Sequence, residues 1–139
     1  MVVQDGMSSS LVTVGLSHTL RDAARKMADN NVGAAVIIDA DLPGPAIITE
    51  RDLLRSSGAG EDLDTELVRD HLTARLIHAA ADWPLERAAV EMTRGGFRHV
   101  IVVEGPEVIG ILSMRDIVRC WVSEGAFDGG SGPAAPAAR

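Results

Sequence analysis

The spacing of hydrophobic residues in the first half of the chain predicts three short strands and two helices. Apolar residues recur at i, i+3, i+4 and i+7 of one amphipathic helix, at Leu20, Ala23, Ala24 and Met27. Apolar runs of strand length occupy residues 11–14, 34–39 and 46–49. A second helix is expected over residues 50–56. The predicted order in this half is therefore strand, helix, strand, strand, helix.

The same order of elements returns in the second half. The helical stripe reappears 65 residues later, at Leu85, Ala88, Ala89 and Met92. Strands are expected at residues 75–79, 99–104 and 108–113, and the last helix at residues 114–121 or slightly beyond. Two halves of this size can bury their apolar faces against one another, whereas neither is large enough to be stable alone. The pattern therefore predicts two similar modules that share a core.

Polar residues at the predicted helix starts indicate how the helices are capped. Thr19 with Asp22 resembles a capping box, with Asp in the place of Glu. In the second half, Asp82 is expected to cap the corresponding helix, and Pro84 suits its first turn. These positions fix where the amphipathic helix of each half begins.

A strand that runs directly into a helix occurs once in each half. Thr49 and Asp52 stand at the first junction, and Ser113 and Asp116 stand at the second, 64 residues later. A Ser, Thr or Asp at such a junction can cap the helix. The three-residue spacing also places both side chains on one face of the first turn. The chain is thus expected to carry the same strand-to-helix corner twice.

Composition indicates the boundaries between the modules. Residues 58–66 are rich in Gly, Ser and acidic residues and are expected to be a linker. The first module, with a frayed or strand-leading arm at residues 1–10, then spans residues 1–57, and the second module spans residues 67–124. Gly, Pro, Ala and Ser dominate residues 125–139, which predicts a disordered tail.

Charge and rare residues exclude several classes of function. The net charge of −7 argues against general affinity for nucleic acid or anionic membranes. Neither a membrane span nor a signal peptide is readable, so a cytoplasmic protein is expected. The four histidines (His18, His71, His78 and His99) lack metal-ligand spacing, so no metal site is expected. Cys120 is the single cysteine and has no readable base, so neither a disulfide nor catalysis is expected.

The repeated corner resembles the ligand signature of the CBS domain pair, or Bateman module. That signature is Gly, two residues, Ser or Thr, two residues, then Asp. The second half matches it fully with Gly110, Ser113 and Asp116, whereas the first half has Ala46 in the place of Gly. The resemblance implies an α/β (α+β) fold of two tandem β-α-β-β-α modules with pseudo-two-fold symmetry. Ala46 is expected to narrow the first cleft, since Gly permits close approach of a ligand.

The resemblance also implies a regulatory adenine nucleotide (AMP, ADP or ATP) or a related adenosyl compound. Asp52 and Asp116 would accept hydrogen bonds from ribose hydroxyls, while Thr49 or Ser113 and helix N-terminal amides would face phosphate. The basic candidates for phosphate are Arg98, His99 and, more weakly, Arg69. The apolar candidates for adenine are Val12 and Ile111 in one cleft, and Ile47, Leu76 and Ile77 in the other. The cleft of Asp116 is expected to be the stronger site.

Each of these assignments has a structural alternative. The two aspartates could serve only as helix caps, and Arg98 with His99 could be an ordinary surface pair. Function divides in the same way: a ligand-sensing module that acts on a protein partner in trans, or a structural dimerisation module with empty clefts. Homodimers are expected in both cases. The helices at residues 50–56 and 114–121 offer apolar side chains for contact at Leu53, Leu54, Ile117, Val118 and Trp121.

Overall fold

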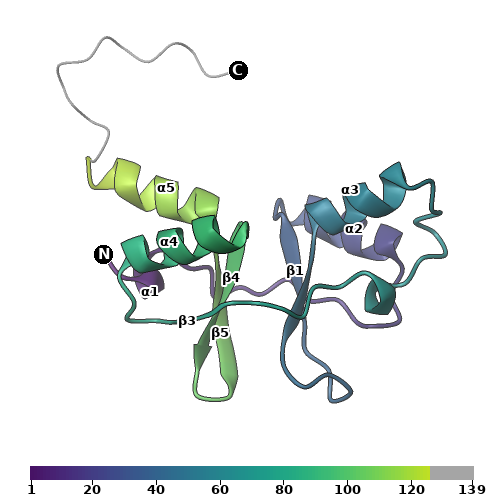
Figure 1. The fold of residues 1–139 in the computed structure, drawn as a ribbon, viewed down its shortest axis with the longest axis horizontal. Coiled ribbons are helices and arrows are strands. Elements are labelled where there is room, and N and C mark those ends of the chain that lie inside the picture. Colours follow the sequence, from purple (N-terminus) through teal and green to yellow (C-terminus); the bar gives the residue numbers. More distant parts are fainter. Residues whose placement is uncertain (126–139) are drawn as a thin grey trace, which may run out of the picture. The chain divides into compact units, whose positions relative to one another are not determined.

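The computed structural model describes residues 1–125 and combines helices with two small sheets, which confirms the expected α+β class (Figure 1). The helices are α1 (Val3–Gly6), α2 (Leu20–Asp29), α3 (Glu50–Gly58), α4 (Leu85–Gly95) and α5 (Met114–Ser123), with a 3-10 helix at Val68–Asp70. The strands are β1 (Ala34–Ile37), β2 (Ala46–Thr49), β3 (His78–Ala80), β4 (His99–Glu104) and β5 (Glu107–Ser113). Apart from Gly125, the tail expected to be disordered lies outside the described residues. None of the described helices has the length and apolar character needed to cross a membrane.

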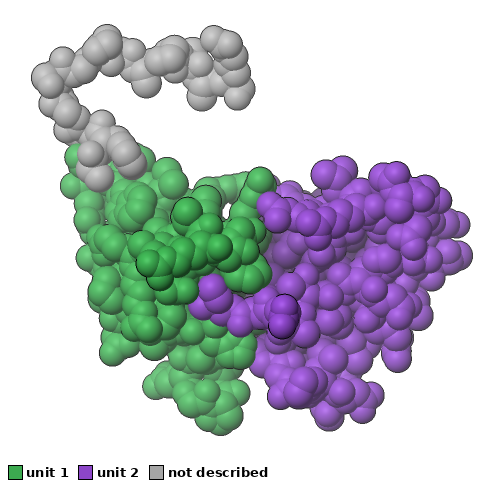
Figure 2. Space-filling model, in the orientation of Figure 1, with its two compact units in different colours: residues 1–8, 78–139 green, residues 9–77 purple. Residues whose placement is uncertain are grey.

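The chain folds into two compact units, and one of them combines both ends of the sequence (Figure 2). One unit joins residues 1–8 to the chain from residue 78 onward, and the other contains residues 9–77. One antiparallel bridge, between Ser8 and Ile111, attaches the N-terminal segment to the unit that begins at residue 78. A second, between Thr73 and Ile47, attaches the segment before residue 78 to the unit of residues 9–77. The compact units therefore differ from the modules expected from the sequence, in which residues 1–8 form the arm of the first module and residues 67–77 open the second.

The unit of residues 9–77 is built on the antiparallel pair β1–β2, in which Ala34 lies opposite Thr49. Residues 11–14 were expected to be a strand but form only an isolated parallel bridge, between Thr13 and Val36. Helices α2 and α3 pack together in this unit (Figure 1). The buried cluster consists of Val14, Leu16, Leu20, Ala23, Met27, Ala35, Ile37, Ala46, Ile48 and Val68. The predicted helical stripe thus faces the core, except that Ala24 is only half-buried.

The other unit contains a three-stranded sheet in the order β3-β4-β5. Strand β3 is parallel to β4, and β5 is antiparallel to β4, so that His99 lies opposite Ser113. Helices α1 and α4 both contact α5 (Figure 1). Leu85, Ala88 and Met92 are fully buried on the inner face of α4. The second half of the repeat therefore uses its helical stripe in the same way as the first.

Two expectations about chain ends and caps are corrected by the structure. The N-terminal arm is not frayed, because the N–H groups of Val3 and Gln4 donate to the carbonyls of Trp83 and Ala81, at 2.8 and 2.9 Å. Val3 itself is fully buried. At α4, the N-cap is Pro84, and no side chain caps this helix. The expected cap from Asp82 is therefore wrong; proline at the N-cap position has no side-chain acceptor to offer.

Candidate functional site

The junction between β5 and α5 holds the first of the two corners. The Oγ atom of Ser113 accepts from the N–H of Asp116 at 3.0 Å, and the Asp116 carboxylate accepts in return from the N–H of Ser113 at 2.8 Å. This reciprocal pair is a capping box, and it fixes the Asp116 side chain on the first turn of α5. The other carboxylate oxygen, Oδ1, pairs with the guanidinium of Arg119 at 2.7 Å.

The junction between β2 and α3 repeats this arrangement. The N–H of Asp52 donates to Thr49 Oγ1 at 3.3 Å, and the N–H of Thr49 donates to Asp52 Oδ2 at 2.9 Å. The Thr73 hydroxyl lies 3.5 and 3.4 Å from the two carboxylate oxygens of Asp52. Sequence reasoning missed Thr73. The signal was present, because Thr73 follows Ser8 by 65 residues and each pairs with the isoleucine after the signature Gly110 or Ala46.

A third capping box shows that a Ser or Thr followed three residues later by Asp is explained by helix capping alone. Thr19 and Asp22 form the same reciprocal hydrogen bonds at the start of α2, a helix that does not begin at either corner. Asp52 and Asp116 therefore both cap helices, as the structural alternative expects, and a second role in ligand binding stays a prediction. In each box, one carboxylate oxygen serves the cap. The Oδ1 atom of each aspartate lies outside the box and could accept hydrogen bonds from a ligand.

The signature glycine is needed for the chain's own packing. A Cβ atom at Gly110 would lie 2.7 Å from Met7 Sδ and 2.8 Å from the carbonyl oxygen of Ser8. Residues 7 and 8 therefore occupy the space in which close approach of a ligand was expected. This contact explains the glycine at position 110 without any bound molecule.

Arg98 is the cationic candidate that the backbone brings to a corner. Its carbonyl accepts from the N–H of Met114, the first residue of α5, at 2.8 Å. The Arg98 side chain is exposed, and its guanidinium forms no ion pair within residues 1–125. The equivalent carbonyl at the other corner belongs to Gly33, which accepts from Glu50 at 3.0 Å and supplies no charge. The half-buried His99 follows Arg98 and faces Ser113 across the β4–β5 ladder.

The remaining candidates are divided between the units. Ile111 belongs to the unit with Ser113 and Asp116, and it is half-buried. The unit with Thr49 and Asp52 contains the other candidates, which are Val12, Ile47, Leu76, Ile77 and the exposed Arg69. Ile47 is buried, whereas Val12, Leu76 and Ile77 are half-buried. The grouping of Val12 with Ile111 around one adenine ring stays a prediction.

Cys120 lies on α5, one turn beyond Asp116, and its thiol is packed inside the unit. A Cβ atom placed on Gly6 would lie 2.8 Å from its sulfur atom. Burial is the main cause that raises the pKa of the Cys120 thiol, with a further contribution from the negative charge of Asp116. A raised pKa favours the protonated thiol, which is a poor nucleophile and a poor metal ligand.

Comparison of the sequence with known proteins reveals relatives that are longer than this chain. An uncharacterised protein of Methanocaldococcus jannaschii is 29% identical over 126 residues, which cover 91% of this chain and 45% of that protein. An uncharacterised protein of Acidianus ambivalens is 32% identical over 102 residues, which cover 73% of this chain and 61% of that protein. The chain thus spans about half the length of these two relatives.

Comparison of structures and of family patterns gives a consistent result. A CBS domain protein of Pyrobaculum aerophilum, whose structure was solved in complex with AMP, is 32% identical. It matches 91% of this chain and 99% of its own, with a TM-score of 0.77. The CBS domain pattern matches residues 3–58 and again residues 68–123. Since these two matches cover most of the sequence, the chain belongs to the CBS domain family and carries two CBS domains in tandem.

Proposed function

We propose that this chain is a regulatory module that binds AMP, or a related adenosine compound, at its strand-to-helix corners. The observation that carries the proposal is the duplicated corner, in which a capping box holds an aspartate with its Oδ1 atom outside the cap. The P. aerophilum relative, solved with AMP, supports adenosine as the ligand class. The module acts on a protein partner in trans in the cytoplasm, and it carries out no chemistry itself.

The chemistry of the corner suits a nucleoside phosphate. A carboxylate accepts hydrogen bonds from the two vicinal hydroxyls of ribose, and charge-assisted bonds of this kind are stronger than neutral ones. The N-terminal amides of an α-helix favour a negatively charged phosphate. At the corner of Asp116, the carbonyl of Arg98 accepts from the first amide of α5, and we expect the guanidinium of the same residue to neutralise a phosphate.

The corner of Asp116 is proposed as the stronger site, because the Arg98 carbonyl accepts there from the first amide of α5, whereas the equivalent carbonyl at the other corner belongs to the uncharged Gly33. One interaction there competes with a ligand, namely the ion pair between Asp116 and Arg119. The Arg119 side chain is 68% exposed. An exposed pair contributes only about 0–1 kcal/mol, so a ribose can displace it at little cost.

Calorimetric titration with AMP tests the site with a matched control. Asp116→Ala should weaken AMP binding about tenfold or more, because each charge-assisted bond contributes roughly 1.5–3 kcal/mol. Asp52→Ala should have a smaller effect. The control is Asp22→Ala, which removes an equivalent capping box from α2 without touching either corner. Its affinity for AMP should equal that of the wild type.

The outcomes of this titration separate the possibilities clearly. If Asp52→Ala weakens AMP binding and Asp116→Ala does not, the order of the two sites is reversed. If Asp22→Ala weakens AMP binding as much as Asp116→Ala, the effect comes from helix stability and the assignment to ribose fails. If AMP does not bind to the wild type, the sensing function itself fails for this nucleotide.

A structural dimerisation module with empty clefts is the second candidate, and exposed apolar side chains favour it. Leu54 on α3 is 72% exposed, and Val118 and Val122 on α5 are 45% and 55% exposed. Ile117, expected to contribute to a dimer contact, is buried within the chain, and Leu53 packs partly against the core of its own unit. A melting panel of AMP, ADP, ATP, S-adenosylmethionine and NAD distinguishes the two functions, since an empty module shows no shift with any of them.

A further inference from the structure

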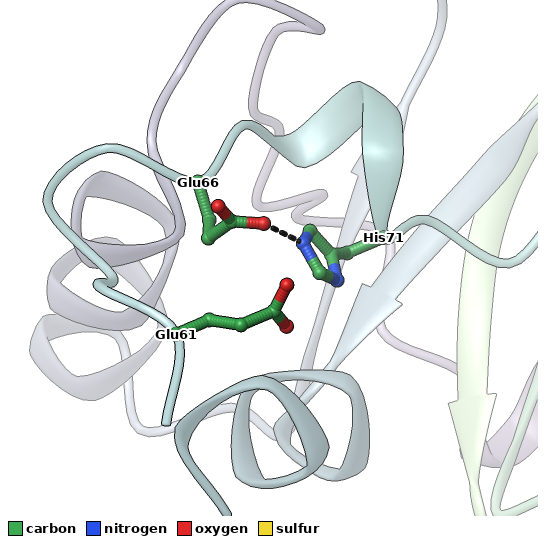
Figure 3. Close-up of side chains that lie close together, drawn as sticks. All are labelled: Glu61, Glu66 and His71. Carbon is green, nitrogen blue, oxygen red and sulfur yellow. Dashed lines mark hydrogen bonds and ion pairs between the residues drawn. The ribbon is translucent and has the colours of Figure 1, made fainter. Parts of the chain in front are cut away.

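Three side chains of metal-binding type, none of them from a strand-to-helix corner, converge in the unit of residues 9–77 (Figure 3). They are Glu61 and Glu66, from the segment that follows α3, and His71, just after the 3-10 helix. One donor atom from each lies within 4.8 Å of the other two. The Nε2 atom of His71 and the Oε1 atom of Glu66 are 2.7 Å apart. Figure 3 shows the Glu61 carboxylate pointing toward the same space.

Backbone hydrogen bonds hold all three residues in place. The N–H of Glu61 donates to the carbonyl of Ser56 at the end of α3, at 3.1 Å. The N–H of Glu66 donates to Asp62, and its carbonyl accepts from Leu20 at the start of α2, both at 2.9 Å. The N–H of His71 donates to Val68 at 3.0 Å. The donor set is therefore attached to three fixed points of the fold.

The charges of the cluster favour a cation. The carboxylate of Glu66 lies close to a second carboxylate, that of Glu61. The His71 side chain is only 17% exposed and that of Glu66 is 30% exposed, so solvent reaches them incompletely. The negative charges of two carboxylates balance the charge of one divalent ion.

We propose that Glu61, Glu66 and His71 form a site for a divalent transition-metal ion of the Zn²⁺ type. An imidazole nitrogen with two carboxylate oxygens is a donor set that Zn²⁺ accepts, whereas Mg²⁺ and Ca²⁺ prefer oxygen alone. Ligands at about 2.0–2.2 Å from one ion lie no more than about 4.4 Å apart, so small side-chain rotations complete the site. The ion ties the segment after α3 to the 3-10 helix. This site is separate from nucleotide binding and does not depend on it.

The competing explanation is a simple ion pair between His71 and Glu66, and Glu61 distinguishes the two. An ion pair needs only two of the three residues, whereas a metal site needs the third ligand as well. Glu61→Gln keeps the side-chain size and leaves the pair of His71 with Glu66 intact. Its melting temperature in chelator should therefore match that of the wild type. A loss of metal binding in this variant then reports the missing ligand and not a change in stability.

The test is calorimetric titration of the metal-free full chain with Zn²⁺ in the absence of nucleotide. The wild type should bind one Zn²⁺ per chain. Glu61→Gln and His71→Gln should each weaken this binding at least tenfold, since even changes next to metal ligands cost 10- to 100-fold. The controls are Glu86→Gln and His78→Gln, at exposed positions of the other unit, and both should bind Zn²⁺ as the wild type does.

Several results overturn the proposal. Zn²⁺ affinity in Glu61→Gln equal to that of the wild type leaves only the ion pair. If His78→Gln loses as much Zn²⁺ affinity as His71→Gln, the ion binds elsewhere in the chain. Absence of saturable binding to the wild type removes the site altogether. Binding of Mg²⁺ as tight as that of Zn²⁺ overturns the assignment to a transition metal.

Discussion

Single residues with the same local geometry differ here in what surrounds them. Asp22, Asp52 and Asp116 each complete a capping box, yet only Asp116 has an arginine carbonyl bonded to the first amide of its helix. The local motif therefore explains why an aspartate occupies each position. The neighbouring residues decide whether a positively charged side chain is available close to that aspartate for a negatively charged ligand.

Arg98 provides a prediction at the residue scale. Arg98→Ala should weaken binding of AMP more than binding of adenosine, because only AMP carries the phosphate that the guanidinium neutralises. The control is Arg94→Ala, which removes an exposed arginine from the last turn of α4. Parallel titrations with the two ligands measure the difference. Equal losses for AMP and adenosine would mean that Arg98 does not contact the phosphate.

Gly110 provides a second prediction at this scale, about stability. Gly110→Ala should destabilise the protein by about 1–3 kcal/mol, because the added Cβ atom meets Met7 Sδ and the Ser8 carbonyl inside a packed unit. Gly44→Ala is the matched control, since no atom lies within 4 Å of a Cβ built there. Urea unfolding of both variants gives the comparison. A fully stable Gly110→Ala would show that residues 7 and 8 move away at little cost.

At the scale of elements, helix starts are strongly specified and the shortest strands are not. Three of the helices begin at a Ser or Thr with an Asp three residues later, and each capping box predicted or implied by that spacing is present. Residues 11–14 have β-branched side chains but form only one bridge. A strand needs a partner along its length, whereas a helix start satisfies its amide groups locally.

The cap of α2 has a pH dependence with a defined sign. The hydrogen bond from the Thr19 amide is the main cause that lowers the pKa of Asp22 in the folded protein. A depressed folded-state pKa means that the ionised carboxylate stabilises the fold at neutral pH, and that this contribution is lost as the pH falls through that pKa. The gap in unfolding free energy between wild type and Asp22→Asn should therefore shrink in acid. Urea unfolding at pH 7 and pH 3 measures it, and a constant gap would contradict the assignment.

At the scale of the whole molecule, the exposed apolar residues of α3 and α5 call for a partner surface. Leu54, Val118 and Val122 remain exposed in the single chain. Leu54 belongs to one unit and Val118 and Val122 to the other, and exposed apolar surface of either unit is a candidate for association. The helices that start at the two corners thus carry the proposed ligand-binding aspartates at one end and exposed apolar side chains along their length, so that each helix would serve both proposed roles.

Assembly through these helices is testable by sedimentation. The wild type should sediment as a homodimer or a larger assembly at micromolar concentration, and Leu54→Glu combined with Val118→Glu should shift it toward monomer, because a buried charge opposes the contact. Val90→Glu, on α4, is the control for added charge at an exposed apolar site. A wild type that is monomeric at this concentration would end the proposal of self-association.

The sequence by itself determined the order of the elements, the repeat and the two corners, because these depend on local periodicity and on hydrogen bonds within a few residues. Thr49, Asp52, Ser113 and Asp116 could be predicted for that reason. Only the tertiary structure decided that residues 1–8 pack with the chain beyond residue 78, since the Ser8–Ile111 bridge joins positions about a hundred residues apart. The cluster of Glu61, Glu66 and His71 was also decided only by the tertiary structure. Their sequence spacing resembles no motif, and only the path of the backbone brings their side chains together.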